Sequence, residues 1–338
     1  MDGASTRYLV NRPLRESNVG SNLGSLAGAL WLGAQLGRRV VVDWRGLSQL
    51  HDPEVNYFSA FFETPPRSLG ADVLYAPADV DYGEEDGPGW LTADDASRIA
   101  RGIQAEPEET LVIRLYHGLD RLHAIPEAAQ WQLLRSFYRD LRPAPAVAAA
   151  VESFARDRLG GAFVVGLNVR TGNGHYFGKG GEYSGRVDVS LFENRRRFLR
   201  TLERACRARV RALPKPLRDS FAVFYATDSE WMSELLASLP NAVTRRTVFP
   251  PPNAGDMFAF PAAGGYTDRD AVVDTLADMF LLARADAFVF NTSMFNQYAR
   301  VTTGEFSGNE VHIESLFLRK RARRAWMRAV AAAGRLRR

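Results

Sequence analysis

The chain has 338 residues, of which 46% are hydrophobic, and a formal net charge of +4. This length allows two domains with substantial cores. A membrane-spanning helix is excluded, because no run reaches the roughly 18 consecutive apolar residues that it needs. The N-terminal residues also lack the pattern of a signal peptide, so we expect a cytoplasmic protein. The single cysteine, Cys206, excludes a disulfide within the chain, and we expect it to pack inside a helix.

The first part of the chain predicts a βαβ unit. Its expected elements are a strand at residues 8–10, a glycine-rich turn at 20–28, a helix at about 25–36 and a strand at 39–44. The turn has no GxGxxG pattern and the chain has no Walker A sequence, which disfavours the nicotinamide-dependent oxidoreductases and the P-loop proteins. The glycines either bring backbone amides near a ligand or permit close packing of the helix on a strand.

The middle of the chain changes from irregular to helical. Residues 51–89 are rich in Pro, Gly, Asp and aromatics, which is typical of an irregular surface region. A helix at about 93–103 and a strand at 110–115 follow, and then a helix that begins at Pro126. Because Pro143 and Pro145 interrupt the helical pattern, we place a domain boundary in this region, between residues 150 and 151.

The second half begins with the most informative stretch of the chain. Residues 162–169 form an apolar run of the kind that is buried on both faces of a parallel sheet. Arg170 follows directly, in a loop that contains Gly172 and Gly174. Since ligands bind parallel sheets at the carboxyl ends of the strands, Arg170 is a candidate to grip phosphate oxygens. The alternative is an arginine that pairs with a neighbouring carboxylate beneath an ordinary turn.

Two further apolar strands end in the same way. Residues 221–225 lead into Thr227 and Asp228, and residues 287–290 lead into Thr292 and Ser293. The start of a helix presents unpaired N–H groups and a partial positive charge, which suits a diphosphate. The alternative is that these residues are plain helix caps, with Thr227 and Glu230 as a capping box.

Residues 316–338 contain nine basic residues and no acidic residue. Their apolar residues recur at helical spacing, so we expect a basic amphipathic helix. Such a helix can contact an anionic membrane or nucleic acid, or it can pack on its own protein with a solvated arginine face. We favour packing, and we do not expect nucleic acid as a partner.

With these motifs assembled, the chain resembles the NodZ-type fucosyltransferases and, more distantly, the eukaryotic α1,6-fucosyltransferases and protein O-fucosyltransferases. The motifs that carry the resemblance extend over most of the chain. They are residues 22–27 (NLGSLA), 42–46 (VDWRG), 168–174 (NVRTGNG), 226–229 (ATDS) and 291–295 (NTSMF).

The resemblance implies an α/β protein of the glycosyltransferase B type, with two Rossmann-like lobes facing a cleft. Residues 1–150 would form the acceptor lobe, residues 151–315 the lobe that binds the nucleotide sugar, and residues 316–338 the basic helix. It also implies an enzyme that transfers fucose or a related hexose from a GDP-sugar, inverts the anomeric centre and needs no metal or other cofactor. The acceptor would be a hydroxyl of a glycan, a glycoside or a small natural product.

By the same resemblance, Arg170 clamps the diphosphate and Asp228 helps to hold the nucleotide, while Thr292 and Ser293 touch phosphate and the loop at residues 20–23 lines the donor. A cationic fork and helix N-termini would stabilise the charge of the leaving diphosphate. The full predicted donor set is Gly20, Asn22, Asn168, Arg170, Asn173, Asp228, Thr292 and Ser293.

The chain departs from the family pattern at two positions. The family usually carries His where this chain has Asn168, and many relatives have a second basic residue where it has Thr171. Either the phosphate grip is weaker here, or another arginine supplies the missing charge. The candidates are Arg186, Arg245, Arg246 and Arg300.

Inversion in one displacement requires a general base that takes the proton of the acceptor hydroxyl. Glu182 is the first candidate, because relatives place a carboxylate in a comparable loop. His175 lies in the same loop and can titrate near neutral pH. Glu16 is a third candidate, because a distant branch of the family has its base in this N-terminal loop.

An alternative function stays open at this point. It is a non-enzymatic protein that binds nucleotides or nucleic acid through the basic C-terminal helix.

Asp274 and Asp278 lie one helical turn apart, as paired catalytic acids would. We expect them to face solvent or to pair with arginines.

Overall fold

The computed structural model contains two compact units, Met1–Ala144 and Pro145–Ala333. The division between them lies at the start of helix α5 (Pro145–Phe154), a few residues before position 150. The structure describes residues 7–14, 17–47, 49–50, 52–63, 73–74, 89–104, 108–114, 122–171, 194–211, 213–249, 267–291, 293, 295–302 and 309–317.

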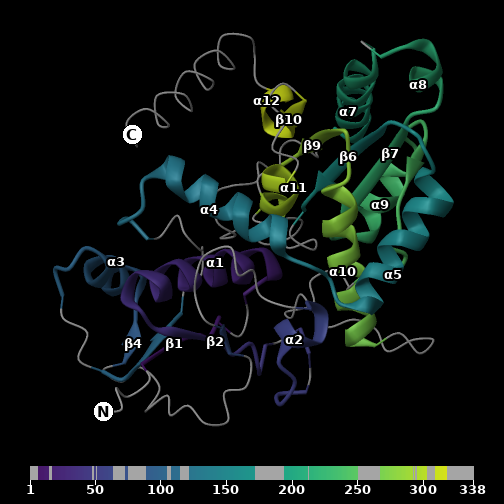
Figure 1. Ribbon diagram of the computed structural model, residues 1–338. Helices are drawn as coiled ribbons and strands as arrows, with labels where there is room; N and C mark the ends of the chain where they lie inside the picture. The colour runs from purple at the N-terminus through teal and green to yellow at the C-terminus, as the bar shows by residue number, and fades with distance from the viewer. Residues whose placement is uncertain are drawn as a thin grey trace. The chain divides into compact units, whose positions relative to one another are not determined.

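The first unit is built on a parallel sheet with the strand order β3-β2-β1-β5-β4. The strands are β1 (Tyr8–Asn11), β2 (Arg39–Val42), β3 (Val73–Leu74), β4 (Trp90–Leu91) and β5 (Thr110–Ile113). The helices are α1 (Val19–Leu36), α2 (Tyr57–Phe61), α3 (Ala93–Ala100) and α4 (Glu127–Asp140). Helix α1 connects β1 to β2 and packs along both strands, as the predicted βαβ unit requires (Figure 1).

Helix α1 begins six residues earlier than the sequence predicts, so the expected glycine-rich turn at 20–28 is wrong. Asn18 is the N-cap, and its side chain accepts a hydrogen bond from the Ser21 amide at 3.0 Å. Each glycine inside a helix costs about 1 kcal/mol relative to alanine, which is why intrinsic preference favours a turn here. Burial of almost the whole helix outweighs that preference.

Gly33 of α1, which lies outside the glycine-rich stretch at 20–28, permits close packing of the helix on β2. The two readings of the glycines at 20–28 stay predictions. A Cβ atom placed on Gly33 would lie 2.4 Å from Val40 Cγ2 on β2, and 3.2 Å from the carbonyl oxygen of Arg38. The helix then ends at Gly37, whose φ of 61° is the left-handed conformation that favours glycine. Arg38 is buried and donates hydrogen bonds to the carbonyls of Tyr8 and Glu109, at the starts of β1 and β5.

The second unit is also built on a parallel sheet, in the order β10-β9-β6-β7-β8. The strands are β6 (Val164–Val169), β7 (Ala222–Thr227), β8 (Ala242–Val243), β9 (Ala287–Phe290) and β10 (Glu310–His312). The helices that follow α5 are the π-helical turn η4 (Ala155–Leu159), α7 (Arg195–Val210), α8 (Lys215–Asp219), α9 (Glu230–Leu236), α10 (Asp268–Leu282), α11 (Asn296–Thr302) and α12 (Ile313–Phe317).

Helices cover both faces of the second sheet, which explains the continuous apolar runs of its strands. On one face, Leu167 of β6 and Val223 of β7 form a core with α7, α9 and α12, and Cys206 of α7 is buried in it as expected. On the other face, Phe224 contacts Phe154 of α5, and Gly166 lies against α10. Every residue of β6, β7 and β9 is buried.

The strand order creates a switch point between β6 and β9. The chain moves outward from β6 to β7 and β8 on one side, and then to β9 and β10 on the other. This is the order of a doubly wound nucleotide-binding sheet, in which ligands bind outside the carboxyl ends of the strands at the switch point. The residues that follow β6, β7 and β9 therefore meet where a ligand is expected.

We predict that Gly33→Ala lowers the free energy of unfolding by about 1–3 kcal/mol, because the added methyl group overpacks the contact between α1 and β2. Alanine is the better helix former, so any gain from helix propensity acts in the opposite direction. The exposed Gln35→Ala in the same helix is the control and should change the value by less than about 0.5 kcal/mol. Urea unfolding measures both; equal stability of the two variants would contradict the close packing.

Candidate active site

Polar residues meet at the carboxyl ends of the three central strands of the second sheet. Arg170 and Thr171 follow β6, Asp228 and Ser229 follow β7, and Asn291 follows β9. Since β6 pairs with β7 on one side and with β9 on the other, these residues are neighbours although they come from distant parts of the chain. The sequence prediction that three strand ends build one site is thus supported by the topology of this unit.

Asp228 binds the chain that leaves β6. Its Oδ1 accepts hydrogen bonds from the Thr171 amide at 2.8 Å and from the Thr171 hydroxyl at 2.9 Å. The same hydroxyl lies 2.9 Å from the Ser229 hydroxyl. Thr171 is fully buried and Asp228 is 4% exposed. The amide and hydroxyl of Thr171 are therefore both hydrogen-bonded to Asp228 inside the unit.

Asn291 binds the same segment from the other side. Its side-chain oxygen accepts from the Arg170 amide at 2.9 Å, and its side-chain nitrogen donates to the Arg170 carbonyl at 2.7 Å. Asn296 in turn donates to the Asn291 carbonyl at 2.6 Å. Both asparagines are fully buried. Two buried side chains, one on each side, therefore hold the backbone at Arg170 and Thr171.

The guanidinium of Arg170 lies at the edge of this arrangement. Its Nε is 3.4 Å from Asp228 Oδ2, and the side chain is 30% exposed. A guanidinium has five N–H donors in a planar fork. Within the described part of the chain, this ion pair is the only polar contact recorded for the Arg170 side chain, so most of its donors remain available to a ligand.

Two buried polar atoms lie along the same strand ends. Asn168 is 1% exposed, and its Oδ1 has no hydrogen-bond partner among the residues that the structure describes. The same holds for the Thr227 hydroxyl, one strand away. A buried polar atom without a partner costs free energy, and functional sites are where such atoms are commonly found.

The alternative that the residues after β7 and β9 are helix caps can be compared with the structure. Thr227 is the last residue of β7, Ser229 is the N-cap of α9, and the Ser229 side chain makes no cap hydrogen bond. A capping box of Thr227 with Glu230 is therefore wrong, because the strand continues further than its apolar run. Ser293 accepts a hydrogen bond from the Phe295 amide at 3.2 Å, in the turn before α11.

Several predicted residues lie outside the described residues. They are Glu16, Asn173, His175, Glu182, Arg186 and Thr292.

In the first unit, Gly20 and Asn22 lie in the opening turns of α1, so the loop expected at 20–23 is helical. Both residues are buried. Asn22 Oδ1 accepts a hydrogen bond from the Ser17 hydroxyl, and the Ser17 carbonyl accepts one from Gln49. The oxygen of the Asn22 amide is therefore occupied inside its own unit.

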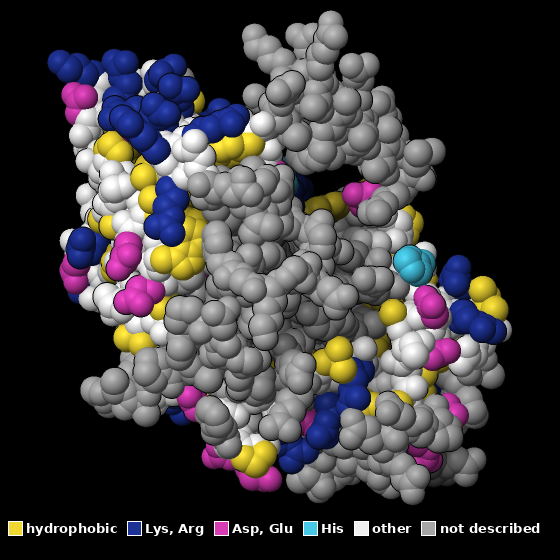
Figure 2. All heavy atoms as spheres, turned by 180° about the vertical axis from the view of Figure 1, so that it is seen from behind, with side chains coloured by type: hydrophobic (Ala, Val, Ile, Leu, Met, Phe, Trp, Pro, Cys, Tyr) yellow, Lys and Arg dark blue, Asp and Glu magenta, His cyan; other side chains and the backbone are white. Residues whose placement is uncertain are grey.

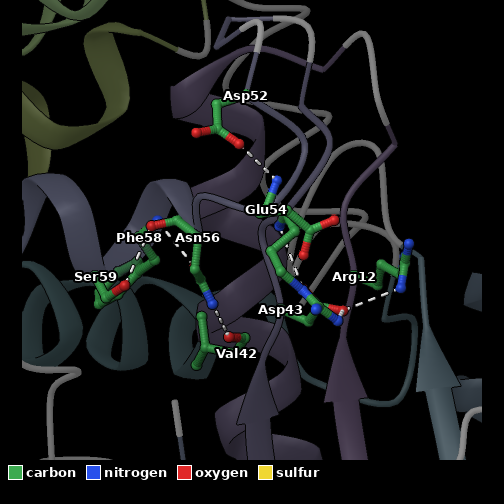
Figure 3. A network of polar contacts seen from close by, with 9 residues as sticks. Arg12, Val42, Asp43, Asp52, Glu54, Asn56, Phe58 and Ser59 are labelled. Carbon is green, nitrogen blue, oxygen red and sulfur yellow. Dashed lines mark hydrogen bonds and ion pairs between the residues drawn. The ribbon is translucent and has the colours of Figure 1, made fainter. Parts of the chain in front are cut away.

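The first sheet also has a polar cluster at its carboxyl edge (Figure 3). Asp43, fully buried after β2, pairs with Arg12 at 3.0 Å and with Arg45 at 2.9 Å. Burial opposes ionisation of Asp43, but the hydrogen bond from Arg45 and the charge of Arg12 outweigh it and hold the pKa of this carboxyl below its ordinary value. Nearby, Asn56 donates to the Val42 carbonyl and so ties the start of α2 to β2.

The arginines considered as substitutes for the missing charge have internal partners. Arg245 pairs with Asp274, and the buried Arg246 lies 3.4 Å from Asp278. Arg300 lies 3.4 Å from Glu310. Asp274 and Asp278 thus pair with arginines, which was one of the two arrangements expected from the sequence. The other expectation, that they face solvent, is wrong for Asp278, which is 2% exposed.

Sequence reasoning missed the roles of Asn291 and Ser229. Asn291 directly follows an apolar strand, as Arg170 does, and this position was the available signal. Its contact with residue 170 crosses 121 positions of sequence, so no local pattern reveals it.

Comparison with known proteins agrees with this fold. The model of the Nodulation protein Z (NodZ) family matches residues 128–311, more than half of the chain. Nodulation protein Z of Bradyrhizobium diazoefficiens is 28% identical over 322 residues, covering 88% of this chain and 80% of that protein. Nodulation protein Z of Sinorhizobium fredii is 24% identical over 311 residues, covering 88% and 91% respectively.

Solved structures show the same architecture. The fucosyltransferase NodZ from Bradyrhizobium has a TM-score of 0.57 at 20% identity, with 88% of this chain and 93% of that chain covered. POFUT1 in complex with GDP-fucose has a TM-score of 0.54 at 11% identity, with 90% and 97% covered. The fold is thus that of the glycosyltransferases of the B type.

The chain belongs to the Nodulation protein Z (NodZ) family, and with it to the glycosyltransferases. The family resemblance seen in the sequence motifs is confirmed.

No group of three or more His, Cys, Asp and Glu side chains within the described ranges is placed to hold a metal ion. No helix in the same ranges is long and apolar enough to cross a membrane.

The Asp278 carboxyl gives a prediction for pH dependence. Burial raises its pKa to about 6 from 3.8, against the attraction of Arg246 and Arg245. The native state therefore binds this proton more tightly than the unfolded state, so the contribution of Asp278 to stability falls as the pH rises from about 4 to about 6. We expect the free energy of unfolding of the wild type, relative to Asp278→Asn, to fall by about 2 kcal/mol over this range.

Urea unfolding of both proteins at several pH values measures this difference. The exposed Asp219→Asn is the control for the chemical change. A wild-type profile parallel to that of Asp278→Asn would contradict the raised pKa.

Proposed function

We propose that this protein transfers fucose, or a related hexose, from a GDP-sugar to a hydroxyl of a glycan, a glycoside or a small natural product. The observation that carries the proposal is the Arg170 guanidinium, held at the switch point of a nucleotide-binding sheet with most of its donors available. Relatives crystallised with GDP and with GDP-fucose support the choice of donor. The alternative of a non-enzymatic nucleotide- or nucleic-acid-binding protein is not favoured, because solved relatives are named fucosyltransferases.

In this proposal, Arg170 binds the diphosphate of the donor. When the sugar leaves, the bond between its anomeric carbon and the β-phosphate oxygen breaks and both electrons stay on that oxygen. A guanidinium fork placed there stabilises the new charge. We propose that Arg170 serves in place of a metal ion, so that the reaction is metal-independent.

Asp228 and Asn291 are positioning residues in this account. Asp228 is almost completely buried, and its Oδ1 is bonded to Thr171, so it acts through the segment that carries Arg170. A rigid backbone lets the guanidinium meet the diphosphate without first losing conformational freedom. Direct contact of Asp228 with the nucleotide, as the resemblance implies, stays a prediction.

The remaining donor contacts are also proposals. Asn168 offers its buried, unpartnered oxygen, and Ser293 lies in the turn between β9 and α11. The contributions of Asn173 and Thr292, and those of Gly20 and Asn22 from the first unit, stay predictions from the family resemblance.

We further propose that the reaction inverts the anomeric centre in a single displacement. The acceptor oxygen attacks the anomeric carbon as the diphosphate leaves from the opposite side, and a general base takes the hydroxyl proton. Glu182 is the first candidate for the base, with His175 and Glu16 as alternatives. A cytoplasmic location and a membrane contact through residues 316–338 also remain predictions.

We predict that Arg170→Ala weakens GDP binding by about 10- to 100-fold, because it removes charge-assisted hydrogen bonds to the diphosphate. Wild-type binding should be equal with magnesium and with a chelator, and tighter for GDP than for UDP or ADP. Titration calorimetry measures these affinities. The exposed Arg135→Ala of α4 is the matched control and should bind GDP as the wild type does.

The activity itself is tested by incubating the protein with GDP-fucose and measuring released GDP, with water in place of the unknown acceptor. Release by the wild type and Arg135→Ala, but not by Arg170→Ala, is the expected result. Unchanged GDP binding and release by Arg170→Ala would contradict the site assignment. Failure of the wild type to bind GDP would contradict the proposed function.

A further inference from the structure

Helix α7 carries a dense row of exposed arginines. Seven of its 16 residues are arginine, and Glu203 is its single acidic residue. The apolar residues lie at helical spacing and face the core of the second unit. The exposed arginines are Arg195, Arg196, Arg197, Arg200, Arg204 and Arg207.

The row continues beyond the end of α7. Arg211, Lys215 and Arg218 are exposed as well, and the short helix α8 buries none of its residues. Leu217 of α8 is 37% exposed, one of two exposed large hydrophobic residues in the described part of the chain. We call the exposed basic residues from Arg195 to Arg218 the basic face. Figure 2 shows Lys and Arg side chains gathered in this way at its upper left.

The basic face opposes the local rules of helix stability. The first turn of α7 contains three arginines and no acid, although the start of a helix has a partial positive charge that repels cations. Arg196, Arg200 and Arg204 follow each other at four-residue spacing, where like charges repel. Rules of this kind are broken at functional surfaces more often than elsewhere.

Little in the described structure neutralises this charge. Arg207 pairs with Glu203 at 2.8 Å, and Arg195 stacks over the Trp231 ring at 5.3 Å. Among the described residues, Arg207 with Glu203 is the only recorded ion pair of the basic face. Residues 195–219 contain ten basic and two acidic residues in a chain whose total is +4, and residues 316–338 hold a second basic cluster, so the remainder of the chain is net negative. The positive charge is thus concentrated, as a surface for an anionic partner requires.

We propose that the basic face docks the protein on an anionic membrane surface. The apolar side of α7 is already used in the protein core, so the helix cannot insert and instead lies against the lipid headgroups, which its arginines attract. Leu217 supplies the second, apolar contact at the boundary with the acyl chains. Stacking of single-stranded nucleic acid requires exposed aromatic rings, and within the described ranges the two exposed large hydrophobic residues, Ile103 and Leu217, are not aromatic.

Vesicle sedimentation tests this proposal with the full chain. The wild type should bind phosphatidylcholine vesicles that contain phosphatidylglycerol, should not bind vesicles of phosphatidylcholine alone, and should be released at high salt. The triple variant R196Q/R200Q/R204Q should lose at least about tenfold in affinity for the anionic vesicles. Because it relieves like-charge repulsion within α7, its Tm should be equal to or higher than that of the wild type.

The matched control is R98Q/R135Q/R139Q, which removes three exposed arginines from α3 and α4 of the first unit. It should bind anionic vesicles as the wild type does. The proposal is overturned if the wild type fails to bind anionic vesicles, or if both triple variants bind them equally well. It is also overturned if RNA binds the protein more tightly than the vesicles do and displaces them. Equal binding by both triple variants would assign the contact to another surface, such as residues 316–338.

A second pair of variants tests the apolar contact. Leu217→Ser should lower vesicle affinity by a few-fold and leave its salt dependence unchanged, because the basic face is intact. Ile103→Ser makes the same change at the other exposed large hydrophobic residue, in the first unit, and should have no effect. If the two serine variants bind vesicles equally, the contribution of Leu217 is overturned.

Discussion

The site depends on the paired hydrogen bonds between Asn291 and the backbone of Arg170. They join the ends of β9 and β6 at the point where the strand order reverses, and they replace the sheet hydrogen bonds that stop there. Asp228 completes the arrangement from β7 by binding Thr171. The backbone is therefore fixed on both sides, and in the proposed function the Arg170 side chain is the element that faces the ligand.

The arginines of the second unit differ in how fully their carboxylate partners satisfy them. The second unit commits Arg245, Arg246 and Arg300 to carboxylates of its own. Arg170 differs from these arginines in that its carboxylate partner, Asp228, also accepts two hydrogen bonds from Thr171. An arginine satisfied in this partial way can exchange solvent for phosphate oxygens at little electrostatic cost.

The parts of the structure that could be predicted from sequence are those set by local pattern. All six predicted strands are present, because runs of buried β-branched and aromatic residues leave few alternatives. The start of α1 was missed because glycine propensity opposes a helix there and only tertiary packing reverses it. Short edge strands such as β8 and β10 carry too few residues to show a pattern. The roles of Asn291 and Ser229 rest on contacts between distant segments, which a single sequence does not contain.

The most direct test of the account is a crystal structure of the protein with GDP bound. The account predicts diphosphate oxygens at about 3 Å from the Arg170 guanidinium, outside the ends of β6 and β9, with both hydrogen bonds between Asn291 and the Arg170 backbone retained. It would be contradicted by a diphosphate bound elsewhere, for example beside Arg12 and Arg45 at the edge of the first sheet, while Arg170 contacts Asp228 alone.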